Sequence, residues 1–109
     1  MKLAELTDAT LKAFLTASSA PTVLTFHATW SKPARTMVSV VSEVAVSYDE
    51  MVRFALVNAE AAQDAINRYG ILNLPTYLVF KNGKLADRFI GLLTKEKLVE
   101  RIEKSLASL

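Results

Sequence analysis

The stretch LTFHATWSKPAR, Leu24 to Arg35, decides the fold of this 109-residue chain. Its first part belongs to a continuous apolar segment, 23–28, whose β-branched and aromatic residues are typical of a strand buried on both faces. Its second part has Ser31 at a helix N-cap position and Pro33 in the first helical turn, where a missing N–H costs nothing. We therefore predict a central strand that runs directly into the start of a helix.

Apolar spacing outside this stretch predicts further helices and strands. The helices begin near Thr7, Pro33, Glu60 and Thr94. The second one is rich in valine, which favours strand by propensity, but its apolar period and its length favour helix up to Tyr48. The additional strands cover residues 52–57, 76–80 and 85–90, with a weak one at 2–5. The pair around Asn82-Gly83 is predicted to be an antiparallel hairpin, and Gly70 is predicted to end the third helix.

The composition excludes several classes of function. The chain has 13 Lys and Arg against 11 Asp and Glu, a net charge of +2 without the basic stripe that a nucleic-acid backbone requires. It has no Cys, so a thiol nucleophile, a disulfide and a thiolate metal site are all impossible within it. No apolar run approaches the roughly 20 residues that span a bilayer, and no secretory signal opens the chain. We expect one soluble domain over residues 1–109, cytoplasmic or also nuclear, without a cofactor, metal, nucleic-acid or membrane partner.

Two segments resemble the signatures of the thioredoxin family. Residues 24–35 resemble the strand that runs into W-C-x-P-C at a helix start, although Ser31 and Ala34 stand here in place of the two cysteines. Residues 71–83, ILNLPTYLVFKNG, resemble the second signature, and Gly91 matches a family glycine. The resemblance covers essentially the whole chain. It implies an α/β thioredoxin fold, a central mixed sheet of four to five strands flanked by four helices in three layers.

The resemblance also implies that the active-site chemistry is lost. Thiol–disulfide exchange proceeds through a mixed disulfide, which the alcohol of Ser31 cannot form and which Ala34 cannot resolve. The buried Asp and the neighbouring Lys that assist proton transfer in the family correspond here to Thr25 and Leu56. Because these positions have changed as well as the cysteines, we favour natural loss of the site over its removal in the laboratory.

A peptide-binding groove is the second feature that the resemblance implies. The positions that match the groove are Trp30, Lys32, Pro33, Ala59, Leu74, Pro75, Ile90, Gly91 and Leu92. We expect Trp30 to be exposed, because large rigid aromatic residues dominate interface energies. X-Pro frequencies favour a trans bond before Pro75, since about one such bond in twenty is cis, whereas the resemblance implies cis. With a cis bond, the backbone of Leu74 would face an extended peptide. If Leu74 and Ile90 do not line the groove, their side chains belong to the core.

Other chemistries are conceivable at the same helix start. Ser31 would be a nucleophile with His27 as its base, but Ser is a preferred N-cap and no acidic residue between 8 and 43 is available to orient the histidine. We therefore favour a packed or partly exposed structural His27 and no catalytic residue. As the only His, it also lacks partner ligands for a metal. Lys32 and Arg35 oppose the dipole of the helix, which predicts either solvated surface charges or contact with an anion of a partner.

Two hypotheses of different class follow. The first is a redox-inactive thioredoxin-like domain that binds a protein or an extended peptide through the groove and serves redox homeostasis by positioning a redox module. Segments 57–60, 67–71 and 87–91 are similar to the domains that precede glutaredoxin modules in multidomain monothiol glutaredoxins, which implies a covalently linked glutaredoxin domain in a longer chain. The second is a thiol–disulfide oxidoreductase whose cysteines were replaced by Ser31 and Ala34, to trap a partner or to prevent oxidation.

Overall fold

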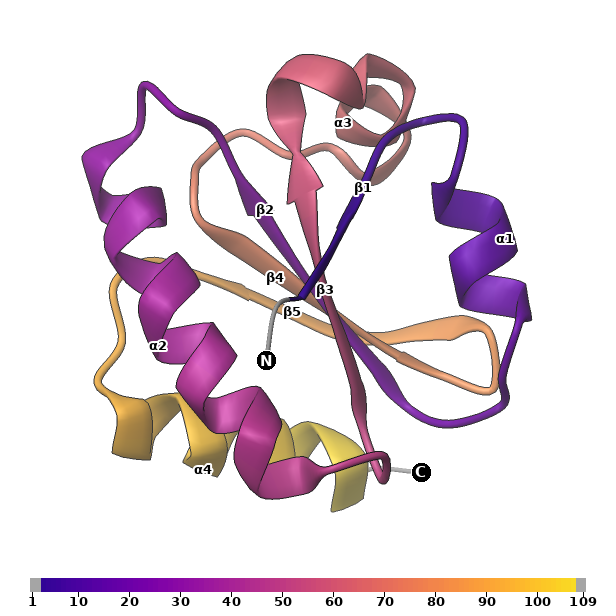
Figure 1. Ribbon diagram of the computed structural model, residues 1–109, viewed down its shortest axis with the longest axis vertical. Helices are drawn as coiled ribbons and strands as arrows, with labels where there is room; N and C mark the ends of the chain where they lie inside the picture. The colour runs from indigo at the N-terminus through magenta and orange to yellow at the C-terminus, as the bar shows by residue number, and fades with distance from the viewer. Residues whose placement is uncertain (1–2, 108–109) are drawn as a thin grey trace.

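A computed structural model describes residues 3–107, in which five strands form one mixed sheet (Figure 1). The strands are β1 (Ala4–Leu6), β2 (Thr22–His27), β3 (Arg53–Asn58), β4 (Thr76–Lys81) and β5 (Lys84–Ile90). Their order in the sheet is β1-β3-β2-β4-β5, with β1, β3 and β2 parallel and with β4 antiparallel to both β2 and β5. The predicted strands are confirmed; residue 2 of the weak first strand lies outside the described residues.

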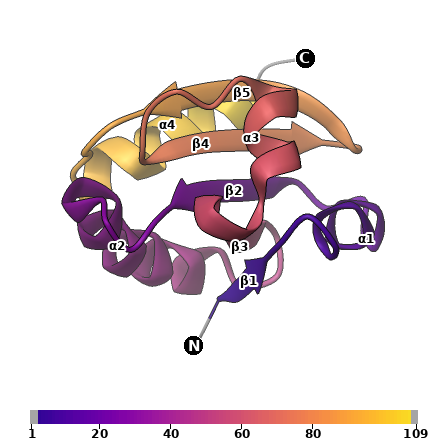
Figure 2. The same cartoon turned by 90° about the horizontal axis from the view of Figure 1, so that it is seen from above.

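Four α-helices cover the sheet within the described range. They are α1 (Leu11–Thr16), α2 (Lys32–Tyr48), α3 (Gln63–Tyr69) and α4 (Lys95–Ala107), with a single 3₁₀ turn η1 (Ala59–Ala61). Helices α2 and α4 lie on one face of the sheet and α1 and α3 on the other, which gives the predicted three layers (Figure 2). None of these helices is long and apolar enough to cross a membrane.

The two faces separate because successive side chains of a strand point to opposite sides. In the fully buried β2, Val23 packs with residues of α2 and α4, whereas Leu24 and Phe26 pack with residues of α1 and α3. The valine-rich segment is a helix, as its period predicted, and it buries Met37 and Val41 against the sheet. The sheet is thus a rigid platform that is covered on both sides.

Two predicted helix starts differ from the structure for local reasons. Residues 7–10 form a hydrogen-bonded turn, in which the Thr7 N–H donates to Oγ1 of Thr10 (3.0 Å), so α1 begins only at Leu11. The helix predicted over 60–69 is divided, because Ala62 has φ −140° and ends the 3₁₀ turn before α3 begins. Gly70 ends α3 in the left-handed conformation (φ 62°), as predicted.

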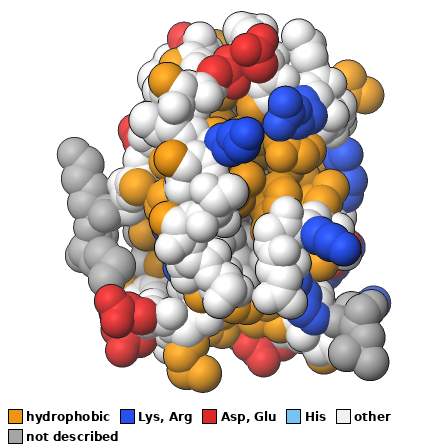
Figure 3. Space-filling model, turned by 90° about the vertical axis from the view of Figure 1, so that its right-hand side faces the viewer, with side chains coloured by type: hydrophobic (Ala, Val, Ile, Leu, Met, Phe, Trp, Pro, Cys, Tyr) orange, Lys and Arg blue, Asp and Glu red, His pale blue; other side chains and the backbone are white. Residues whose placement is uncertain are grey.

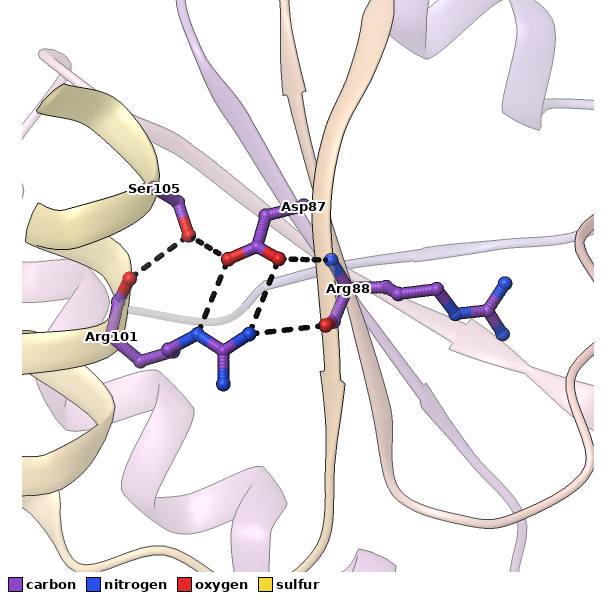
Figure 4. Close-up of polar contacts among 4 residues, drawn as sticks. All are labelled: Asp87, Arg88, Arg101 and Ser105. Atoms are coloured by element: carbon purple, nitrogen blue, oxygen red, sulfur yellow. Dashed lines mark hydrogen bonds and ion pairs between the residues drawn. The ribbon is translucent and has the colours of Figure 1, made fainter. Parts of the chain in front are cut away.

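A polar cluster fastens α4 to the edge strand β5 (Figure 4). The carboxylate of Asp87 accepts hydrogen bonds from Nε and Nη2 of Arg101 (both 3.2 Å) and from Oγ of Ser105 (2.6 Å). Arg101 also lies over the ring of Phe89, 4.7 Å from its centroid. Because β5 leads directly into residues 90–92, this cluster supports one side of the predicted groove.

Candidate functional site

The predicted site residues come from three segments that meet at one end of the sheet (Figure 1). Phe26, near the carboxyl end of β2, pairs with Thr76 at the start of β4, and Thr76 pairs with Ile90 at the end of β5. The Leu74–Pro75 peptide bond is cis, and the carbonyl of Pro75 accepts a hydrogen bond from the Gly91 N–H (3.0 Å). The loop after β2, the proline segment and residues 90–92 therefore form one continuous region.

Ser31 is the N-cap of α2, as predicted. It has extended backbone angles (φ −98°, ψ 106°), and its Oγ accepts the Ala34 N–H at 3.4 Å. Ser31 and Ala34 are both buried, and no hydrogen bond joins Ser31 to His27 within residues 3–107. The two positions that match the family cysteines thus hold a capping hydroxyl and a methyl group, neither of which is arranged for catalysis.

Large apolar side chains are exposed around this centre. Trp30 is 70% exposed, Ile90 53% and Leu92 61%, which is unusual for such residues. Pro75 is buried and Leu74 is half-buried against the cluster under α1 and α3. Of the two groove residues with a core alternative, Leu74 is therefore partly in the core and Ile90 is at the surface. We call Trp30, Leu74, Ile90 and Leu92, together with Pro75, the apolar groove, after the family groove that these positions match.

Leu72 is an exposed residue of this region that the sequence interpretation missed. It lies three residues before Pro75, in the loop that leads into β4, and its side chain is exposed. The loop has no periodic pattern, so a single leucine in it carries no signal of exposure.

Thr29 is the second feature that the sequence interpretation missed, because it is held by residues far along the chain. Its N–H and its hydroxyl donate to Oε1 of Glu60 (3.1 and 2.9 Å), and its carbonyl accepts a hydrogen bond from Nη1 of Arg35. The Thr29 N–H and then its hydroxyl hold the pKa of Glu60 below its usual range, against a smaller opposing effect of burial. We call these three residues the Thr29 clasp; it fixes the backbone directly before Trp30 between α2 and η1.

His27 is buried, as predicted, but the structure supplies an acidic neighbour that the sequence interpretation did not expect. Its Nε2 lies 3.4 Å from Oε1 of Glu5 on β1, which lies beyond β3 in the sheet. Nε2 is buried and makes no hydrogen bond. Oγ1 of Thr25, at the position of the family's Asp, is also buried without a hydrogen bond. Neither residue orients Ser31, so the structure contains no Ser–His–acid triad at these positions.

The two cations at the start of α2 differ in their surroundings. Arg35 donates to the carbonyl of Thr29, whereas Lys32 is exposed and has no ion pair or hydrogen bond in the described part of the chain. Contact of this pair with an anion of a partner stays a prediction. No group of three His, Asp or Glu side chains within residues 3–107 is placed to hold a metal ion.

Comparison with known proteins agrees with the fold. The family model described as Thioredoxin matches residues 2–104. Thioredoxin Y2, chloroplastic, from Arabidopsis thaliana is 40% identical over 89 residues, which are 82% of this chain and 53% of that protein. Thioredoxin 1 from Synechococcus elongatus is 35% identical over 103 residues, 94% of this chain and 96% of that protein. Thioredoxin 1 from Nostoc sp. is 33% identical over 103 residues, with the same two coverages.

The relatives differ in length. The chain spans about half the length of the chloroplastic relative and nearly all of the cyanobacterial ones. All three are thioredoxins by name, so the expected likeness to domains beside glutaredoxin modules has no support from them.

Proposed function

The chain belongs to the thioredoxin family, and we propose that it is a redox-inactive member that binds an extended peptide or protein segment in the apolar groove. The family's exchange reaction begins with attack by a thiolate, and this chain has no thiol. What remains is a platform that exposes apolar surface beside a cis-proline.

The exposure of Trp30 carries this proposal. An indole that is 70% exposed on a loop leaves a large apolar area in water unless a partner covers it. The Thr29 clasp holds that loop, so the indole is presented at a low cost in conformational entropy. Rigid aromatic residues of this kind are the usual energetic centres of protein interfaces.

An extended segment is the partner that fits the backbone beside Trp30. Leu74 precedes the cis bond to Pro75 outside the strand β4, and the Pro75 carbonyl is already bonded to Gly91. The exposed side chains of Ile90 and Leu92 flank this segment and would contact alternate side chains of a bound peptide. A redox module, separate or covalently linked, is the class of partner that family membership favours.

Selection of peptides from a displayed library on the wild-type chain, followed by calorimetry, tests the proposal. We expect Trp30→Ala to weaken binding of a selected peptide about 30-fold, the loss of a hot-spot aromatic residue. Met51→Ala is the matched control, because Met51 is 79% exposed at the turn between α2 and β3, outside the groove. Equal losses in the two variants, or none in either, would contradict the proposal.

The second candidate is a thiol–disulfide oxidoreductase whose cysteines were replaced. The observation that favours it is Ser31, which differs from cysteine in a single atom and occupies the N-cap beside an intact Trp30, Pro33 and cis Pro75. Thr25 and Leu56 speak against it, because a replacement of the cysteines alone would leave these positions unchanged. Codons 31 and 34 of the source gene decide between the candidates: cysteine at both would replace the first proposal with the second.

A further inference from the structure

A hollow of about 410 Å³ opens on the other side of the fold from α2 and α4, between α1, α3 and the turn that joins β4 to β5. None of its lining residues belongs to the apolar groove or to the Thr29 clasp. Figure 3 shows hydrophobic side chains at the floor of a hollow on this face and Lys and Arg side chains at its margin. Its volume lies within the range of roughly 300–1,000 Å³ that is usual for small-molecule sites.

The apolar part of the lining is preformed. Leu11 and Ala65 are buried, and Leu15 and Tyr69 are half-buried members of the same core cluster. The ring of Tyr69 packs edge-to-face on Phe80 with 5.9 Å between centroids, so its position is fixed by the core. A ligand would therefore find an ordered apolar wall there.

The charged part of the lining has two unpaired cations. Lys12 on α1 and Arg68 on α3 are exposed, and neither side chain has an ion pair or hydrogen bond within residues 3–107. The lining also contains Asp8 and Asp64. Both carboxylate oxygens of Asp8 already accept backbone N–H groups of α3, from Asp64 at 2.9 Å and from Ala65 at 3.0 Å. The four charged side chains of the lining sum to zero, but neither cation is paired with either carboxylate in the described residues. The N–H donors of Lys12 and Arg68 are therefore open to an anionic group of a ligand.

We propose that this hollow binds a small amphipathic anion, with its apolar body on Leu11, Leu15 and Tyr69 and its anionic group beside Lys12 and Arg68. The apolar wall supplies most of the affinity and the two cations orient the ligand. A carboxylate, a sulfonate and a phosphate all meet this description. The inference is independent of the proposed peptide binding, because the two sites share no residue.

The probe for this site is 8-anilino-1-naphthalenesulfonate, which joins apolar rings to one sulfonate. We expect saturable fluorescence enhancement with the native protein, and chemical-shift changes concentrated in residues 8–16, 64–69 and 83 when the chain is ¹⁵N-labelled. The double variant K12A/R68A is expected to bind the probe about tenfold more weakly, the loss of roughly one charge-assisted contact. Lys95→Ala, a change of an exposed lysine on α4, is expected to leave the affinity unchanged.

The neutral analogue N-phenyl-1-naphthylamine separates the anionic contact from apolar contact alone. It lacks only the sulfonate, so we expect it to bind the wild-type chain about tenfold more weakly than the probe does. We expect its affinity for K12A/R68A to equal its affinity for the wild type. Three results would overturn the proposal: no saturable binding, equal affinity of the probe for the wild type and K12A/R68A, or shift changes confined to the apolar groove and abolished by Trp30→Ala. A concentration-dependent dimer that buries this face would overturn it as well.

Discussion

Replacement of Asp87 by Asn should loosen α4 from β5 by an amount that the structure allows us to estimate. The carboxylate accepts four hydrogen bonds, from Ser105 Oγ (2.6 Å), the Arg88 N–H (2.8 Å) and two nitrogens of Arg101 (3.2 Å each). The side chains of Arg101 and Asp87 are 41% and 26% exposed, so their ion pair contributes about 0.5–1 kcal/mol. The short bond from buried Ser105 to a charged acceptor adds about 1.5–2 kcal/mol.

The expected loss is therefore about 2–3 kcal/mol of unfolding free energy at neutral pH. It is not larger, because the single hydroxyl proton of Ser105 has a second acceptor within reach, the carbonyl of Arg101 (2.9 Å), and can donate to it in the variant. For a domain of this size the loss lowers the melting temperature by about 10 °C.

The same cluster predicts a pH dependence. Burial raises the pKa of Asp87, but the hydrogen bonds from Ser105, Arg101 and the Arg88 N–H together outweigh it and leave the pKa below its usual range. A carboxyl group with a lowered pKa in the folded state stabilises the fold above its unfolded pKa of about 3.9. That stabilisation is lost as the pH falls through the folded-state value. The wild type should therefore lose stability more steeply than Asp87→Asn below about pH 4.

Urea unfolding at several pH values, followed by circular dichroism, measures both effects. Asp49→Asn is the matched control, because Asp49 is an exposed acid at the far end of α2 that forms no ion pair in the described residues. If Asp87→Asn unfolds at the same urea concentration as the wild type at pH 7, the cluster does not fasten α4 and the reasoning fails. An unchanged acid profile would refute the pKa argument separately.

Further predictions concern the site itself. Glu60→Gln keeps an acceptor in the Thr29 clasp but removes the negative charge of Glu60. The amides of residues 28–31 should then show faster backbone motion by NMR relaxation, and a selected peptide should bind more weakly. The control Glu96→Gln on α4 should change neither. Because the pKa of Glu60 is lowered in the folded state, the clasp should persist below the usual carboxyl pKa and open only as the pH falls through the lowered value. Ser31→Ala should lower the free energy of unfolding in urea by about 0.5–1 kcal/mol. This is the low end for loss of an N-cap, because the hydrogen bond of Ser31 is long (3.4 Å). A loss above about 2 kcal/mol would mean that Ser31 does more than cap α2. In an insulin-reduction assay with dithiothreitol the chain should not exceed the uncatalysed rate, and a clear acceleration would show redox chemistry that needs no cysteine.

Local patterns predicted the elements of the fold because their causes are local. The apolar run of β2, the Asn82-Gly83 hairpin and the N-cap of α2 each depend on neighbours within a few residues. The division of the helix after β3 was not predicted, since it depends on the backbone angles of Ala62 that no residue type marks. The mixed sheet in three layers and the cis bond were expected only through the family resemblance.

The candidate site was predicted where it consists of exposed side chains of the two signatures, and missed where it depends on distant contacts. Trp30 and Ile90 were expected in the groove and are exposed. The bonds between Thr29 and Glu60 join residues 31 positions apart, and Glu5 approaches His27 from another strand. Such contacts exist only once the sheet has formed, so inspection of the local sequence cannot reveal them.

A residue-level map of peptide binding tests most directly whether the apolar groove is the binding site. A peptide selected on the wild-type chain is titrated into ¹⁵N-labelled protein in the presence of dithiothreitol. If the peptide binds in the apolar groove, the largest amide shifts occur at Trp30, Leu74 and residues 90–92, and they persist when every cysteine of the peptide is replaced by serine. Shifts that avoid these residues, or binding that is lost with the cysteines of the peptide, would contradict this prediction.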